Sequence, residues 1–128
     1  MEISLKTMEL IQNALQIVIS LGILNVWCLR GGKATQYRGK GAATIKEEFA
    51  AYGLSKSAFY AVGSIKVACA VALLVGIWLS VLVLPAAGIL AFLMVGAVAM
   101  HLKVKDPAMK SVPAVVVLSM CLVVMLLA

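Results

Sequence analysis

Charged residues are scarce in this chain of 128 residues, at 12% of the total, whereas hydrophobic residues make up 64%. Soluble domains are about half apolar and about a quarter charged, so a soluble fold could not bury this much apolar surface. Little sequence lies outside the apolar segments, which leaves no room for a soluble catalytic domain. The composition therefore predicts one integral membrane domain over residues 1–128.

Paired cysteines are also missing from the sequence. Cys28, Cys69 and Cys121 are odd in number, and none belongs to a Cys-x-x-Cys pair. Each lies in or at the end of an apolar segment, where cysteine usually behaves as a small hydrophobic residue. Their spacing indicates neither a disulfide framework nor a metal site. The residues by themselves indicate no cofactor.

Four apolar segments are long enough to cross a bilayer, at about residues 8–29, 57–79, 85–102 and 112–128. Residues 67–100 carry no charge and would measure about 50 Å as one helix, so the chain must turn back within them. Ser80 and Pro85 mark the turn, because proline is tolerated in a first helical turn. The fourth segment is near the lower length limit, so a buried hairpin that does not cross is the alternative. The first apolar run is too long for a cleaved signal peptide.

Residues 30–56 form the one long polar linker. Glycines make its first half irregular, whereas Thr44 to Glu47 reads as a capping box that starts a helix. Ile45, Phe49 and Tyr52 share one face of that helix. The sequence thus predicts an all-α integral membrane fold: a bundle of four transmembrane helices with a short amphipathic interfacial helix between spans one and two. A plain connector that covers the bundle is the alternative to a gating element.

Basic residues predict the orientation of the chain. Six lie in the linker and three in the loop between spans three and four, which is nine of the eleven Lys and Arg residues. Basic loops stay on the cytoplasmic side, so we expect both termini outside. Because these residues are loop residues between spans, we expect the bilayer rather than a nucleic acid as the partner. The nine residues are Arg30, Lys33, Arg38, Lys40, Lys46, Lys56, Lys103, Lys105 and Lys110.

Small residues predict how the spans pack. Ala68, Ala72 and Gly76 form a ridge on span two, and Ala87 and Ala91 form one on span three. Such ridges let helix backbones approach closely in lipid. We expect spans two and three to form a close hairpin, and the ridges also allow a homo-oligomer.

Lys66 and His101 are the two polar residues most open to a functional interpretation. Lys66 lies well inside span two, where an ammonium is costly and should face the bundle or a wet cavity. Lys66 could transfer a proton, bind a substrate or donate to a quinone carbonyl. In the alternative interpretation, its side chain extends to the lipid headgroups by snorkelling. His101 ends span three and could relay protons, donate to a quinone or bind haem; the alternative is an ordinary interface residue.

Depth along the spans groups further residues near the same end. Asn25 of span one, Tyr60 of span two and Lys103 after span three fall at a level similar to that of Lys66 and His101. These five residues form the candidate ligand pocket, at the cytoplasmic end of the bundle. A belt of aromatic and cationic residues would produce the same grouping without a pocket. No residue is assigned a catalytic role.

With these residues in hand, the chain resembles the DoxX-like family of small four-span membrane proteins. The resemblance rests on VGSIKVACAVALLVGIW, on GAVAMHLKVKDPAMKSVPA, and on LRGGKATQYRGKG followed by KEEFAAYGL, which together cover most of the chain. Family members include a membrane subunit of a thiosulfate:quinone oxidoreductase, partners of redox enzymes and helpers of receptor assembly. The resemblance implies that Lys66, His101, Lys103 and Asp106 are the matching positions, and we expect a bacterial inner (plasma) membrane.

The first functional hypothesis is a membrane subunit or partner of a quinone-linked oxidoreductase system, with quinone as the ligand and a membrane or soluble redox protein as the partner. The missing thiol pair argues against a disulfide-exchange mechanism. The alternative is a non-enzymatic membrane scaffold or assembly factor for another membrane protein. A transporter or channel fits worst, since one intramembrane lysine without an acidic partner makes a poor ion path.

Overall fold

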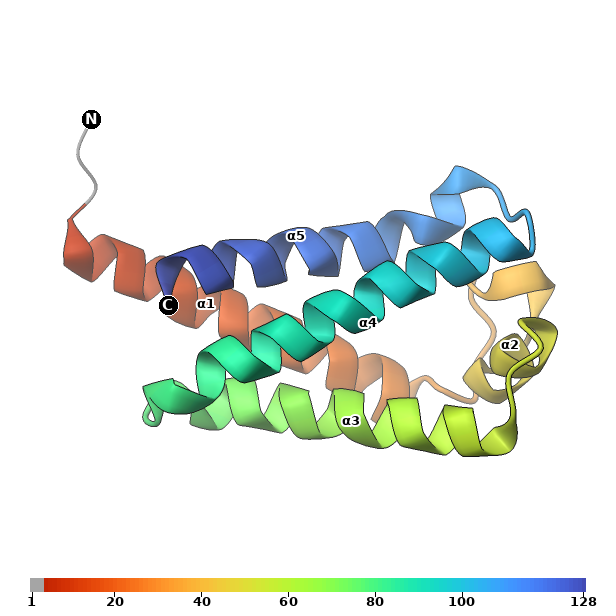
Figure 1. The fold of residues 1–128 in the computed structure, drawn as a ribbon, viewed down its shortest axis with the longest axis horizontal. Helices are drawn as coiled ribbons and strands as arrows, with labels where there is room; N and C mark the ends of the chain where they lie inside the picture. The colour runs from red at the N-terminus through yellow and green to blue at the C-terminus, as the bar shows by residue number, and fades with distance from the viewer. Residues whose placement is uncertain (1–3) are drawn as a thin grey trace.

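The computed structural model describes residues 4–128 of the chain. Within that range the fold is all-helical, and four helices are long and apolar enough to span a membrane. They are α1 (Leu5–Leu24), α3 (Lys56–Val75), α4 (Val83–Lys103) and α5 (Val112–Leu127). Each packs on two neighbours, in the cyclic order α1, α3, α4, α5, so the bundle runs up and down (Figure 1). The predicted fold class, a membrane-type four-helix bundle, is confirmed.

Local sequence explains where these helices begin. The hydroxyl of Ser4 accepts a hydrogen bond from the backbone N–H of Thr7 at the start of α1, and Ser55 does the same for Ala58 at the start of α3. These caps satisfy N–H groups that have no partner inside the helix. α3 ends at Val75, four residues before the predicted end, because a turn and a short 3-10 segment at Ser80–Leu82 carry the chain round into α4.

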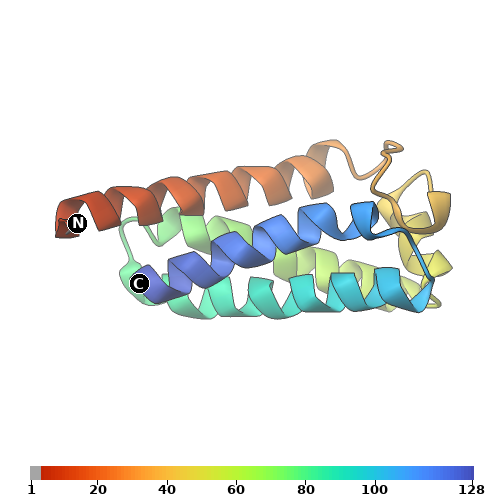
Figure 2. The same ribbon diagram turned by 90° about the horizontal axis from the view of Figure 1, so that it is seen from above.

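The linker folds over one end of the bundle, opposite the end where α1 begins and α5 ends (Figures 1 and 2). It contains a 3-10 turn at Gly39–Gly41 and the short helix α2 (Ile45–Ala51). Thr44 caps α2 by accepting from the N–H of Glu47, as the sequence predicted. The predicted face of α2 turns inward, since Ile45 and Tyr52 are buried. Whether α2 lies at a membrane interface stays a prediction.

The tightly packed core occupies the half of the bundle away from the linker. Its buried side chains come from all four long helices. Gln16 is buried there with its amide satisfied, because its Nε2 donates to the carbonyl of Leu73 at 2.8 Å. α3 and α4 are neighbours, but α4 makes its most extensive contacts with α5 rather than in the α3–α4 hairpin that the small residues predicted. The core comprises Ile19, Ile23, Cys69, Ala70, Leu73, Val83, Ala86, Ala87, Leu90, Ala91, Cys121 and Val124.

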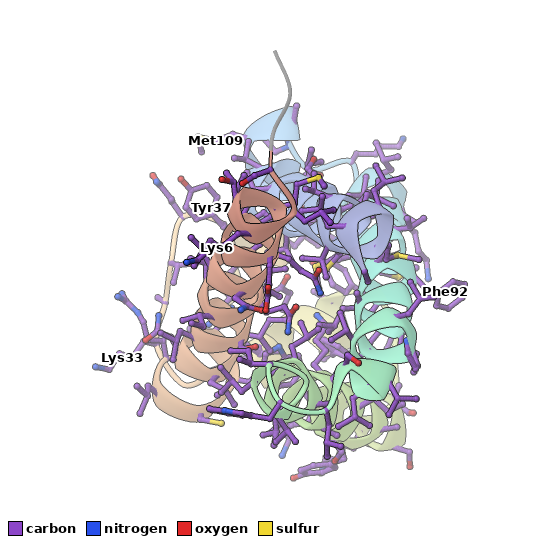
Figure 3. The ribbon with its side chains drawn as sticks, turned by 90° about the vertical axis from the view of Figure 1, so that its left-hand side faces the viewer. Lys6, Lys33, Tyr37, Phe92 and Met109 are labelled. Carbon is purple, nitrogen blue, oxygen red and sulfur yellow. The ribbon has the colours of Figure 1, made fainter. Side chains whose placement is uncertain are left out.

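The outer surface of the long helices is apolar. Trp78, Phe92 and Leu126 are each more than three-quarters exposed, and Phe92 points away from the bundle when it is viewed along its length (Figure 3). A water-soluble bundle would not expose such a surface, whereas lipid tails cover it at no cost. The protein is therefore a multi-pass membrane protein.

Candidate functional site

An aromatic cluster joins α1, α2 and α3 at the linker end. α1 is continued by a π-helical turn at Asn25–Leu29, which carries Trp27. The Trp27 ring lies 5.9 Å from Phe49 and 5.6 Å from Phe59, between ring centroids. It lies so close to the backbone of Gly63 that a Cβ there would be 2.6 Å from its Cζ3 atom. Glycine at position 63 thus allows the benzene edge of the indole to approach the backbone of α3.

Lys66 lies next to this cluster, one turn further along α3. Its ammonium is 5.3 Å from the centroid of the Trp27 ring, a distance at which a cation is attracted to the ring face. The three ion pairs found among residues 4–128 do not include Lys66. The lysine therefore has an aromatic neighbour but no carboxylate within ion-pair distance.

A buried polar network lies beside the cluster and connects the linker to α4. The hydroxyl of Tyr52 donates to Glu48 at 2.5 Å, and the other carboxylate oxygen of Glu48 is 3.7 Å from the Arg38 guanidinium. His101 Nδ1 is 2.8 Å from Asp106 Oδ2. Because an ionised carboxylate can only accept, the proton of this hydrogen bond lies on Nδ1. The Nε2 atom is left facing Glu48, 4.0 Å away.

The network controls the ionisation of its members. Burial and the hydrogen bond to Glu48 raise the pKa of Tyr52, so its phenol stays protonated and keeps donating. Burial would raise the pKa of Asp106, but hydrogen bonds from His101 and from the Lys40 N–H, with nearby positive charge, outweigh it and lower that pKa. Asp106 is therefore a carboxylate at neutral pH.

Three polar contacts hold the linker on the bundle end. The backbone N–H of Lys40 donates to Asp106 at 3.0 Å. The ammonium groups of Lys103 and Lys110 donate to the carbonyls of Tyr52 at 2.8 Å and Arg38 at 2.6 Å. Each contact spans more than 50 positions of sequence, so together they fix the linker against the α4–α5 loop.

A cavity of about 980 Å³ lies under this cover, in the linker-end half of the bundle. All four long helices, α2 and the linker contribute to its walls. Lys66, His101, Arg38 and Glu48 supply charged or titratable groups, while the walls from α4 and α5 are mainly apolar. The tight core closes its far end. The arrangement could hold a molecule with a polar head and an apolar body.

The five residues proposed from the sequence separate into two groups. Lys66, His101 and Asn25 line the cavity. Tyr60 lies instead on a second, smaller groove on the outer side of α3, with its side chain mostly exposed. Lys103 is turned away from the cavity and bonds to the linker.

Sequence reasoning missed the role of Arg38, which is 6% exposed and holds the linker together from inside. Its Nη2 donates to the carbonyls of Arg30 and Lys33, in addition to the contact with Glu48. In the sequence it appears as one of six basic linker residues, with no feature that sets it apart. In residues 4–128, no group of three or more His, Cys, Asp or Glu side chains is placed to hold a metal ion.

Comparisons with known proteins give one match. The model of the DoxX-like family matches residues 19–125, which covers most of the chain and includes every residue that lines the cavity. No curated protein and no solved structure matches the chain. On the family match, the chain belongs to the DoxX-like family, as its sequence motifs predicted.

Proposed function

We propose that this DoxX-like protein is a membrane subunit or partner of a quinone-linked oxidoreductase system, and that its cavity binds the head of a quinone-like molecule. The observation that carries the proposal is the cavity of about 980 Å³ with Lys66 and His101 in its lining. Ligand pockets for small molecules are mostly apolar clefts of about 300–1,000 Å³ with a few polar groups that orient the ligand. A quinone has that division, with carbonyl oxygens on the ring and an apolar tail.

The polar groups are suited to the oxygen atoms of a quinone or of its reduced quinol. Lys66 can donate from its ammonium to a carbonyl oxygen, and it has no carboxylate within ion-pair distance among the described residues. His101 donates its Nδ1 proton to Asp106, so the neutral imidazole offers Nε2 as an acceptor for a quinol hydroxyl. On the positive-inside rule, we propose that this end of the bundle is at the cytoplasmic face and that both termini are outside. We further propose that the membrane is a bacterial inner membrane.

Binding can be measured through the single indole at the cavity. The chain has two tryptophans, and Trp78 lies outside the cavity in the turn after α3, so Trp78→Phe leaves Trp27 as the only reporter. We expect a short-chain quinone to quench Trp27 saturably in this variant. We also expect an organic extract of the gently purified protein to contain quinone.

Two substitutions test the proposed contacts. Lys66→Met should weaken binding of the quinone, and His101→Asn binding of the reduced quinol, each by roughly five- to 150-fold, the range expected for one good polar contact. Asparagine keeps a group that can donate to Asp106. Lys33→Met is the matched control, because Lys33 is exposed, lies outside the cavity lining and points outward (Figure 3). Equal affinity in all variants would refute the proposed site.

A non-enzymatic scaffold or assembly factor is the second candidate. It is favoured by the exposed lysines around the linker end, which could receive an acidic partner surface. This candidate predicts that Lys66→Met leaves partner binding unchanged. Replacing Lys33 and Lys46 together by Glu would instead disturb copurification of a partner. These lysines are Lys33, Lys40, Lys46, Lys56 and Lys105; Lys103 is exposed as well, but its ammonium is bonded to the Tyr52 carbonyl.

A further inference from the structure

Positive charge exceeds negative charge around the cavity. Four cationic side chains and one carboxylate belong to its lining, which gives a formal balance of four minus one, or plus three, with His101 neutral. The cations are Arg30, Arg38, Lys66 and Lys110, and the carboxylate is Glu48. An apolar cavity with this excess favours a ligand of the opposite charge.

The single carboxylate is already in use. Glu48 accepts from Tyr52 at 2.5 Å and lies 3.7 Å from Arg38, so its charge is matched within the polar network. The ammonium of Lys110 is likewise occupied, since it donates to the Arg38 carbonyl at 2.6 Å. Of the four cations, Lys66 lies inside a membrane span. Within residues 4–128, its ammonium makes no hydrogen bond and no ion pair.

The position of Lys66 makes that free charge costly. It is ten residues past the start of α3, about 15 Å along the helix axis. Ammonium groups at such depth are normally paired or lie in a wet cavity. The Trp27 ring face at 5.3 Å offers some compensation, but an aromatic ring does not replace an anion.

The opposite walls of the cavity suit an apolar chain. They carry aliphatic and small side chains from α4 and α5 and no charge between the level of Lys66 and the tight core. These are Leu93, Met94, Ala97, Val116 and Val117. Within residues 4–128, the site therefore combines a cation inside the spans that has no anionic partner with a long apolar surface.

We propose that the bound ligand is an amphiphile whose head carries negatively charged oxygen, such as a carboxylate, a phosphate or an ionised hydroxyl, paired with Lys66. The apolar part of the ligand would lie along α4 and α5. This inference rests on the proposed function and narrows it, because it states the charge of the head group. A neutral quinone would fill the cavity and leave the Lys66 charge unpaired.

A matched pair of ligands separates the charge from the rest of the head. An alkylated 2-hydroxy-1,4-naphthoquinone has an acidic hydroxyl that is ionised at neutral pH, and its 2-methoxy derivative is neutral with the same ring and tail. Both compounds quench tryptophan. Saturable quenching of Trp27 is titrated in the Trp78→Phe protein, in nanodiscs of zwitterionic lipid. The same titrations are made with Lys66→Met, Lys66→Arg and Lys33→Met added, and melting curves confirm that each variant is folded.

The expected result is a charge preference that depends on Lys66. For each protein, the dissociation constant of the methoxy compound is divided by that of the hydroxy compound. The ratio for the Lys66→Met protein measures the unequal partition of the two compounds into lipid. The ratio for the starting protein should be larger by roughly tenfold or more. Lys66→Arg should retain most of the preference and Lys33→Met all of it. The same preference with and without Lys66 would overturn the anionic head group and leave the ligand-binding function standing. Saturable quenching by neither compound would refute the ligand-binding function itself.

Competition then identifies the source of the anion. Displacement of the hydroxy compound by a small fraction of phosphatidylglycerol in the nanodisc would identify an anionic membrane lipid. Displacement by inorganic phosphate in the buffer would identify a soluble anion. Displacement by neither would leave a free amphiphile of the tested kind. In each case the head that pairs with Lys66 is anionic.

Discussion

Replacing Asp106 by Ala should release the linker from the end of the bundle. The carboxylate accepts from His101 Nδ1 at 2.8 Å and from the Lys40 N–H at 3.0 Å, and its side chain is only 5% exposed. The substitution leaves the buried imidazole N–H without its acceptor, whereas water can reach the Lys40 N–H. A lost hydrogen bond to a charged group costs about 1.5–3 kcal/mol. We therefore expect linker opening to become easier by about 2 kcal/mol.

Trypsin provides the assay, because the linker contains cleavage sites at Lys33, Arg38 and Lys40. When the linker opens and closes faster than the protease cuts, the cleavage rate follows the open fraction. A change of about 2 kcal/mol then corresponds to roughly 30-fold faster cleavage in this segment. Lys105→Ala is the control, one residue away, because no side-chain hydrogen bond or ion pair of Lys105 is found in residues 4–128.

The pH dependence follows from the lowered pKa of Asp106. A carboxyl whose native pKa is lowered contributes stability above its ordinary pKa of about 3.9, and that stability is lost as the pH falls through the native value. The contribution is thus complete at the neutral pH of the assay. Cleavage of the Asp106→Ala protein at the same rate as the Lys105→Ala protein would refute the conclusion that the contacts of Asp106 hold the linker on the bundle end.

Three further outcomes are expected. Gly63→Ala should destabilise the protein by about 1–3 kcal/mol and shift Trp27 emission, because the new methyl group meets the indole. Gly96→Ala should do neither, because the space around Gly96 is open. Melting curves and emission spectra of the two variants test this. The pKa of Tyr52 is raised in the folded protein, so the protonated phenol contributes its full stability below its ordinary pKa of about 10. This stability is lost only as the pH rises through the higher pKa of the folded state. Tyr52→Phe should therefore not reduce the tyrosinate absorbance formed at about pH 11. After removal of the native thiols, Lys33→Cys should react with an impermeant thiol reagent only in inverted vesicles, and labelling in intact cells would contradict the orientation.

The fold could be predicted because lipid imposes simple rules on a sequence. Each span must be apolar over about 20 residues, and each buried backbone group must be satisfied within its own helix. The uncharged stretch of residues 67–100 could only be a hairpin for that reason. The end of α3 at Val75 was harder to predict, because Ile77, Trp78 and Leu79 are as apolar as the helix although they belong to the turn.

Helical periodicity explains which site residues reach the cavity. Tyr60 is six positions before Lys66, which puts it about 120° away around α3, whereas Val62, four positions before, shares the face of Lys66. Lys103 is two positions after His101, about 160° away on the extended α4 helix. Depth alone grouped these residues, and the angle around each helix separates them.

The polar network is invisible to periodicity because it forms between distant segments. Arg38 meets Glu48 only when the irregular half of the linker folds back on α2, and Asp106 meets Lys40 across 66 positions. Gly39 makes this fold possible, since a Cβ there would lie 2.6 Å from the Tyr52 ring. No local pattern records such a close approach, so one glycine among several in the linker could not be distinguished.

Some loop lysines hold the linker on the bundle, whereas others are exposed, and this difference allows the two functional candidates to be tested separately. Counted by sequence, Lys103 and Lys110 are positive charges that orient the chain, yet both donate to linker carbonyls and hold the cover over the cavity. A partner that docks on the linker end would therefore meet the exposed lysines of the linker and of position 105 instead. The ligand proposal depends on Lys66 inside the bundle, and the scaffold proposal depends on residues outside it. Substitutions in one set leave the other intact, so each function can be tested without disturbing the residues that the other requires.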